Sequence, residues 1–172
     1  MKLFGESQER NLKRCMKAVE SALQELGLEP GECLLDPSEY PEGEIPDNCL
    51  SWHFPVPEQD GGDPTRTPRS AEVAILLSVH DDANRLEVRS LVARLPDSNI
   101  LPLYRRLLEL NAEQLDDVAF GVSGDFIVLT TARKTKDITA EQVGEMIEAV
   151  AALSHHFQTP LRDEFACLPQ DE

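Results

Sequence analysis

The sequence predicts an α+β protein with a single antiparallel sheet of about five strands and three helices, in the order α-β-β-β-α-β-β-α. Two patterns indicate this class: three stretches place apolar residues at helical spacing, and short stretches between them alternate apolar and polar residues. The strands come in groups, and a βαβ pattern with a parallel sheet would need a helix after each strand. The length of 172 residues fits one domain, residues 1–172.

The first helix is predicted over residues 7–26. Its apolar residues recur every three or four positions, at Leu12, Cys15, Met16, Val19, Ala22, Leu23 and Leu26. Gly27 then supplies a helix stop. The opposite face carries most of the lysines and arginines of this region, so we expect it to face water.

Residues 29–70 are predicted to form an acidic insert rich in proline and glycine, partly mobile. Residues 29–63 contain ten Asp and Glu side chains and no Lys or Arg. Only residues 49–54 alternate as a strand does, with Leu50, Trp52 and Phe54 on one face.

The whole chain is acidic, with 16 Lys and Arg against 32 Asp and Glu, a net charge of −16. A surface of this sign repels phosphate backbones, which disfavours direct binding of nucleic acid. The sequence shows neither the apolar core of a signal peptide nor a run of roughly 18 apolar residues. We therefore expect a cytoplasmic protein without membrane contact.

A hairpin is predicted next, with strands over residues 71–80 and 85–95 and a turn at 81–84. Val73, Ile75 and Leu77 share one face of its first strand. A short helix over residues 100–110 follows. Its main stripe is Ile100, Leu103, Tyr104 and Leu107, but Leu101 and Leu108 lie beside this stripe. The extra width fits either a deeply buried helix or a helix that also contacts a second copy of the chain.

The second hairpin is predicted over residues 118–131, and Gly124 permits the positive φ of its tight turn. Both faces of its second strand are apolar, so this strand is either central or covered by a partner. The last helix starts with a capping box, Thr139 with Gln142, and is predicted to end at Pro160.

No catalytic motif occurs in the sequence, and no cofactor or metal is expected. His155 and His156 are adjacent and point about 100° apart on a helix, which suits an interaction with the helix dipole better than one shared metal. Asp81–Asp82 and Asp116–Asp117 flank turns, where aspartate bonds to the backbone. We therefore expect a protein without enzymatic activity.

The stretch from 71 to 157 resembles YbjN-like proteins and bacterial type III secretion chaperones. The similar features are a helix ending in Leu110–Asn111, a hairpin turn at Ser123–Gly124–Asp125, and the entry Asp137–Ile138–Thr139–x–Glu141 into the last helix. The resemblance implies a type III secretion chaperone-like fold and a small acidic homodimer that binds a protein or peptide client.

In those chaperones the dimer forms around the second helix and the adjacent sheet, which corresponds here to Leu101, Tyr104, Arg105 and Leu108. Clients wind in extended form over the first helix and the sheet, and a strand containing Ile127 and Leu129 could receive such a chain by apolar contact or edge pairing. We therefore predict a non-catalytic adaptor. Two alternatives stay open: a small metal-dependent hydrolase using Asp or His residues, and an acidic regulator of a nucleic-acid-binding protein.

Overall fold

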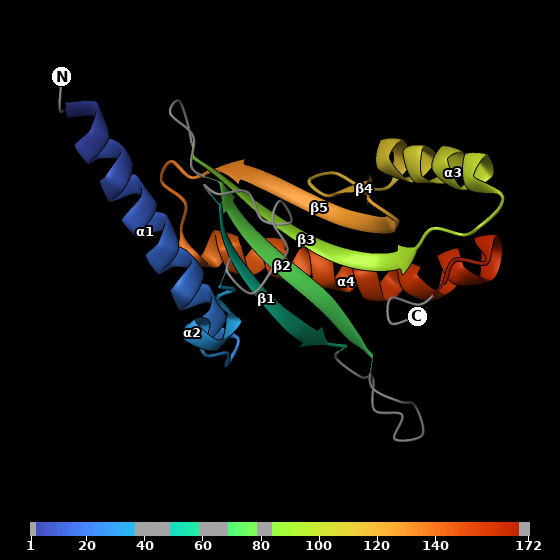
Figure 1. Cartoon of the computed structure of the whole chain (residues 1–172), viewed down its shortest axis with the longest axis horizontal. Helices are drawn as coiled ribbons and strands as arrows, with labels where there is room; N and C mark the ends of the chain where they lie inside the picture. The colour runs from blue at the N-terminus through green and yellow to red at the C-terminus, as the bar shows by residue number, and fades with distance from the viewer. Residues whose placement is uncertain (1–2, 37–48, 59–68, 79–83, 169–172) are drawn as a thin grey trace. The chain divides into compact units, whose positions relative to one another are not determined.

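The computed structural model describes residues 3–36, 49–58, 69–78 and 84–168. Its elements follow in the order α1 (Leu3–Glu25), α2 (Pro30–Cys33), β1 (Cys49–Pro57), β2 (Ser70–Ser78), β3 (Arg85–Arg94), α3 (Ile100–Glu113), β4 (Ala119–Ser123), β5 (Phe126–Lys134) and α4 (Ala140–Phe165) (Figure 1). The strands form one sheet in the order β1-β2-β3-β5-β4. The predicted α+β class with five strands is confirmed, with one short helix, α2, in addition.

Contacts divide the chain into two compact units, each built from three segments. Unit 1 comprises Met1–Phe54, Ala74–Val88 and Ala132–Ile147, and unit 2 comprises Pro55–Val73, Arg89–Thr131 and Glu148–Glu172. The interactions described below lie within one unit or the other. The single domain expected over residues 1–172 stays a prediction.

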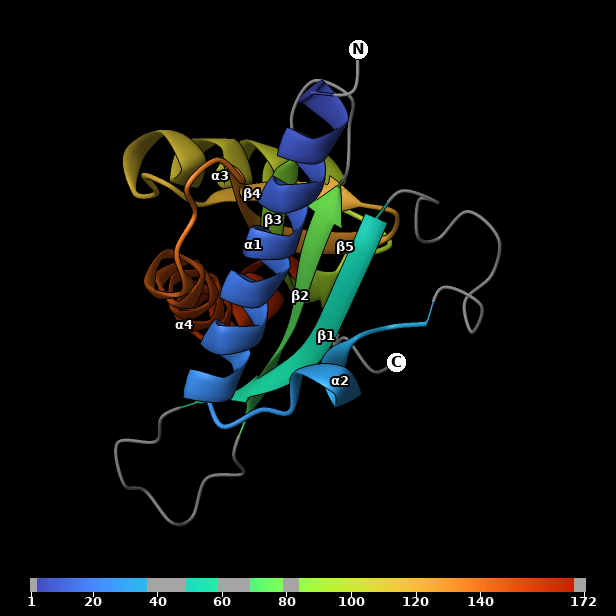
Figure 2. The ribbon, with the colours of Figure 1, turned by 90° about the vertical axis from the view of Figure 1, so that its left-hand side faces the viewer.

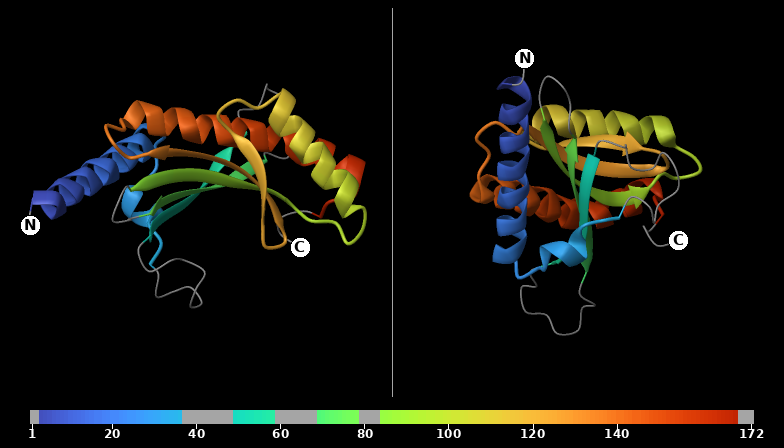
Figure 3. Two further views of the ribbon diagram at one scale, coloured as in Figure 1. Left: turned by 90° about the horizontal axis from the view of Figure 1, so that it is seen from above. Right: turned by 60° about the vertical axis from the view of Figure 1, so that its left-hand side comes forward.

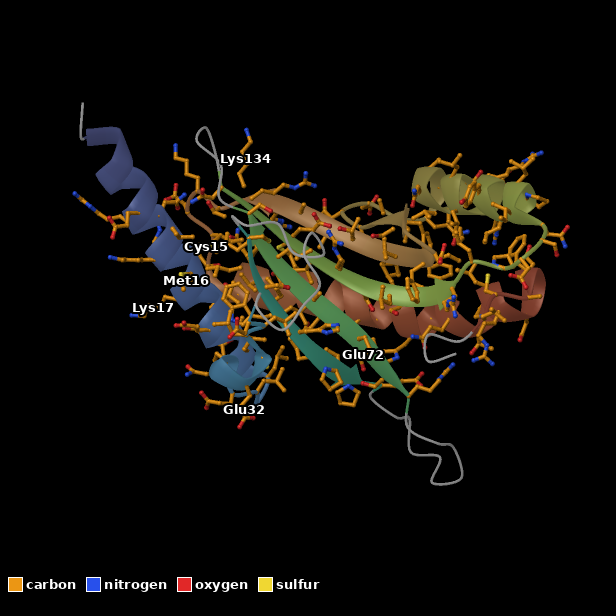
Figure 4. The ribbon with its side chains drawn as sticks, in the orientation of Figure 1. Cys15, Met16, Lys17, Glu32, Glu72 and Lys134 are labelled. Carbon is orange, nitrogen blue, oxygen red and sulfur yellow. The ribbon has the colours of Figure 1, made fainter. Side chains whose placement is uncertain are left out.

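In unit 1, the apolar face of α1 is buried and its basic face is exposed to water. Cys15, Val19 and Leu23 are fully buried, and Figure 4 shows Lys17 on the opposite side of the helix. The helix ends at Glu25, and the predicted stop residue, Gly27, has φ +77°. The Leu28 N–H donates to the Leu23 carbonyl at 3.0 Å, the bond expected where a left-handed residue closes a helix.

The acidic insert contributes α2 and β1. Pro30 opens α2, a position where the missing N–H costs no helical bond. The strand runs three residues beyond the predicted end at 54, and the side chains of Trp52 and Phe54 are buried. The chain after α2 lies beside β1, where the Leu35 N–H donates to the Ser51 carbonyl at 2.9 Å (Figure 2). Residues 37–48 and 59–68 of the insert lie outside the described residues, as do Asp81 and Asp82 of the predicted turn.

The paired residues of β4 and β5, 119–130, belong to unit 2. Their hairpin has a two-residue turn, because Ser123 pairs with Phe126. Gly124 has φ +57°, so the predicted positive φ is confirmed. Strand β5 lies between β3 and β4. Of the two positions predicted for this apolar strand, the structure therefore shows the central one.

Helix α4 begins as predicted and ends later. Thr139 and Gln142 exchange hydrogen bonds at 3.2 and 3.3 Å, which confirms the capping box. The predicted end at Pro160 is wrong, because α4 continues to Phe165. Proline removes one helical hydrogen bond without forcing the chain to stop, and Leu161, one residue later, is 2% exposed. Burial of this side chain favours continuation of the helix.

Candidate protein-binding surface

Helix α3 packs against β4 within unit 2 (Figure 3). Its inner face is formed by Leu103, Leu107 and Leu110, which are at most 4% exposed. The three- and four-residue spacing of these leucines places them on one side of the helix. They hold α3 in a fixed rotation, which determines the residues that it presents to water.

The outward side of α3 carries a second stripe, which we name the α3 stripe: Leu101, Arg105, Leu108 and Ala112. All four residues are exposed, and the two leucines are 80% and 68% exposed. Their spacing of four, three and four residues keeps them on one face over three turns. Two leucines this exposed on one helix form an apolar surface that a polypeptide partner could cover.

An ion pair lies beside the two leucines. The Arg105 Nε donates to Glu109 Oε1 at 2.8 Å, four residues along the helix. This hydrogen bond raises the pKa of Arg105 above its ordinary value. Both side chains are accessible to water, so the pair adds little to folding. It does give the α3 stripe one positive and one negative group at fixed positions.

The structure brings four of the six predicted site residues together and separates the other two. Leu101, Arg105 and Leu108 lie on the α3 stripe, and Tyr104 is half-buried beside them. Ile127 and Leu129 are 0% exposed. The β4–β5 register places Leu129 opposite Phe120, on the same face of the hairpin. The assignment of these six residues to a partner stays a prediction.

The two adjacent histidines weighed for chemistry lie within α4. His155 and His156 are not at a helix end, because α4 continues for more than two turns beyond them, so the predicted interaction with the helix dipole is wrong. The His155 Nε2 instead lies 3.2 Å from the Val56 carbonyl oxygen. Within the described ranges no three His, Cys, Asp or Glu side chains are grouped so that they could hold a metal ion. Asp81 and Asp82 lie outside those ranges.

Unit 2 also contains a pocket of about 970 Å³ between α4 and the adjoining ends of β1 and β2. Arg69 is one of the residues that line it. The guanidinium bonds both carboxylate oxygens of Glu58, at 2.9 and 3.2 Å, and donates to Thr159 Oγ1 at 2.6 Å. The side chains of Arg69 and Glu58 are about three-quarters buried, which makes this pair stronger than a surface pair. These bonds link the end of β1 and the start of β2 to α4.

Sequence reasoning gave no role to Asn111 beyond its place in the family pattern. The structure shows its side-chain amide bound to the backbone of Phe120. The Phe120 N–H donates to Asn111 Oδ1 at 2.7 Å, and Asn111 Nδ2 donates to the Phe120 carbonyl at 3.1 Å. An asparagine eight residues before a strand is the only sequence signal for this contact, and no local rule predicts it.

Similarity to known proteins agrees with this architecture. The model of the YbjN family, described as "Putative bacterial sensory transduction regulator", matches residues 48–163, more than half of the chain. No curated protein sequence matches the chain. None of the described helices is both long and apolar enough to cross a membrane.

Solved structures show a similar fold at low sequence identity. The structure of the ExsC–ExsE complex aligns with a TM-score of 0.51 and 14% identity, over 92% of this chain and 96% of that chain. YbjN from E. coli aligns with a TM-score of 0.46 and 16% identity, over 90% and 96%. The Yersinia pestis type III secretion chaperone SycH, solved with a fragment of YscM2, aligns with a TM-score of 0.43 and 13% identity, over 83% and 98%. The chain belongs to the YbjN family and has an α+β fold similar to that of the ExsC–ExsE complex.

Proposed function

We propose that this chain is a non-catalytic adaptor that binds other proteins and works as a homodimer formed through the α3 stripe. The observation that carries the proposal is the exposure of Leu101 and Leu108, 80% and 68%, on a helix whose other leucines are buried. Covering two leucines would remove a substantial apolar area from water, and each would contribute about 1.5–3 kcal/mol if it became fully buried.

The α3 stripe is self-complementary, which supports a second copy as its occupant. In a twofold arrangement of two antiparallel α3 helices, Leu101 of one copy meets the far end of the other stripe. Arg105 of each copy then comes near Glu109 of the other. Leucines at seven-residue spacing are also the pattern that packs between neighbouring helices.

Two further observations support binding of a protein client. The fold is similar to that of the ExsC–ExsE complex, a structure determined with a bound protein. The net charge of −16 keeps such a chain soluble while apolar surface is open. No observation within the described residues favours the metal-dependent hydrolase or the nucleic-acid-related regulator, so we propose the adaptor alone.

The experiment is sedimentation of the full chain at micromolar concentration. We expect the wild type to be dimeric and the double variant Leu101→Ser/Leu108→Ser to be monomeric with an unchanged thermal midpoint. Leu26→Ser is the matched control, because Leu26 is an exposed leucine, 39%, in the turn directly after α1 and not on α3. A monomeric wild type would remove the dimer from the proposal.

The client is tested separately, by affinity purification of the tagged chain followed by mass spectrometry. We expect one or a few proteins to co-purify in proportion to the bait. If no protein co-purifies from cells that express the chain at native level, the adaptor function is contradicted, whatever the oligomeric state. High salt in the wash distinguishes the forces: apolar contacts survive it, and charge contacts weaken.

A further inference from the structure

The edges of a sheet are the places where an extended polypeptide is most easily added. An edge strand has a row of unpaired N–H and C=O groups, and a client can bond to this row as one more strand. Here the edge strands are β1 and β4. Strand β5, to which edge pairing of a client was predicted, has β3 on one side and β4 on the other. Its backbone is not at an edge.

The β4 edge is occupied by the side chain of Asn111. The amide accepts from the Phe120 N–H at 2.7 Å and donates to the Phe120 carbonyl at 3.1 Å. These are the two bonds that a facing residue of an added antiparallel strand would make. A single primary amide therefore takes the place of a strand neighbour at Phe120, one of the two outward-facing residues of β4.

Asn111 is held in this place by its helix. It lies in the last turns of α3, directly after Leu110, which is 1% exposed. Helix α3 itself packs along β4 (Figure 3). Backbone groups alternate in direction along a strand, so Val122 is the next outward-facing residue, and only Ser123 lies between it and the two-residue turn. The backbone groups of this single residue are too few to pair with an added strand.

The β1 edge is closed by different means in its two halves. In the first half, Leu34 forms an antiparallel bridge with Trp52, and the Leu35 N–H donates to the outward-facing Ser51 carbonyl at 2.9 Å. By the same alternation, the outward-facing positions of the second half include Pro55 and Pro57. Proline has no N–H to donate, and it is a known protection of edge strands.

We propose that both edges of this sheet are closed to strand addition, and that Asn111 is the residue that closes β4. A polypeptide partner is then bound through side-chain contacts on helix and sheet faces and not as an added strand. The mode of binding rests on the proposed adaptor function. The closure of the edges belongs to the chain alone and can be tested without any partner.

The role of Asn111 is tested by hydrogen exchange of the Phe120 amide in the full chain, followed by NMR. In Asn111→Leu, which keeps the size of the side chain and removes both bonds, we expect exchange to become at least about tenfold faster. In Asn111→Asp, which keeps the acceptor, the amide stays protected. Asn11→Leu is the control, because the hydrogen bonds of the Asn11 amide go to side chains, those of Thr135 and Arg14. Unchanged exchange in folded Asn111→Leu would overturn this role.

Strand addition is tested with two labelled peptides and the wild-type chain. FIVLTTARK has the sequence of β5, the neighbour of β4, and SAEVAILLS has the sequence of β2, which lies next to β1 in the sheet. We expect no saturable change in fluorescence anisotropy with either peptide. Saturable binding that N-methylation of the peptide backbone abolishes would overturn the closure of that edge. If the α3 variants fail to change the oligomeric state while these results hold, only the proposed function fails.

Discussion

Helix α3 and strand β5 both have more apolar residues than one buried face requires. The additional apolar residues are buried in β5 but exposed in α3. In β5, Ile127, Val128 and Leu129 are at most 6% exposed, so consecutive residues on opposite faces are buried. In α3, Leu101 and Leu108 stay in water. A strand at the centre of a sheet can be covered on both faces by its own chain, whereas a helix at the side of β4 is covered on one face.

The largest difference between the two regions is expected in folding stability. We expect Leu129→Ala to lower the free energy of unfolding by about 2–5 kcal/mol, because it leaves a cavity around a fully buried position. The matched change Leu108→Ala, at an exposed leucine, should cost no more than about 0.5 kcal/mol. Urea denaturation measures the loss in the free energy of unfolding for each of the two variants. Equal losses would mean that Leu108 is buried in solution.

A smaller effect is expected at the turn that brings β4 and β5 together. Gly124 has φ +57°, where a Cβ atom is unfavourable. Gly124→Ala should therefore lower the free energy of unfolding by about 1 kcal/mol. Gly144, within α4, has open space around its Cα and no positive φ. Gly144→Ala should stabilise the chain by about 0.4–1 kcal/mol. Thermal denaturation would contradict this account if both midpoints moved in the same direction.

The smallest effect on stability is expected at the α3 stripe. Arg105 and Glu109 form an exposed ion pair four residues apart. We expect Arg105→Gln to leave the thermal midpoint unchanged, because such pairs contribute little in water. The same variant should weaken dimerisation in sedimentation experiments at low salt, and the difference from wild type should shrink at high salt. A shifted midpoint with normal dimerisation would assign Arg105 to folding and not to the partner surface.

The local elements of this chain could be predicted because their causes lie within a few residues. The capping box at Thr139, the Gly27 helix stop and the Gly124 turn each depend on the backbone preference of one or two residues. The end of α4 was not predicted, because Pro160 is a local signal that the burial of Leu161 outweighs. The contact of His155 with the Val56 carbonyl was not predicted either, because the two residues are 99 positions apart in the sequence.

The sequence by itself determined the fold class, the place of most helices and strands, and the family pattern. It also showed that two segments have surplus apolar residues. Only the tertiary structure decided which surplus is buried, because that depends on the sheet order β1-β2-β3-β5-β4. It likewise decided that Asn111 meets the backbone of Phe120, because a side-chain amide has no preferred distant partner until packing brings one within hydrogen-bond distance.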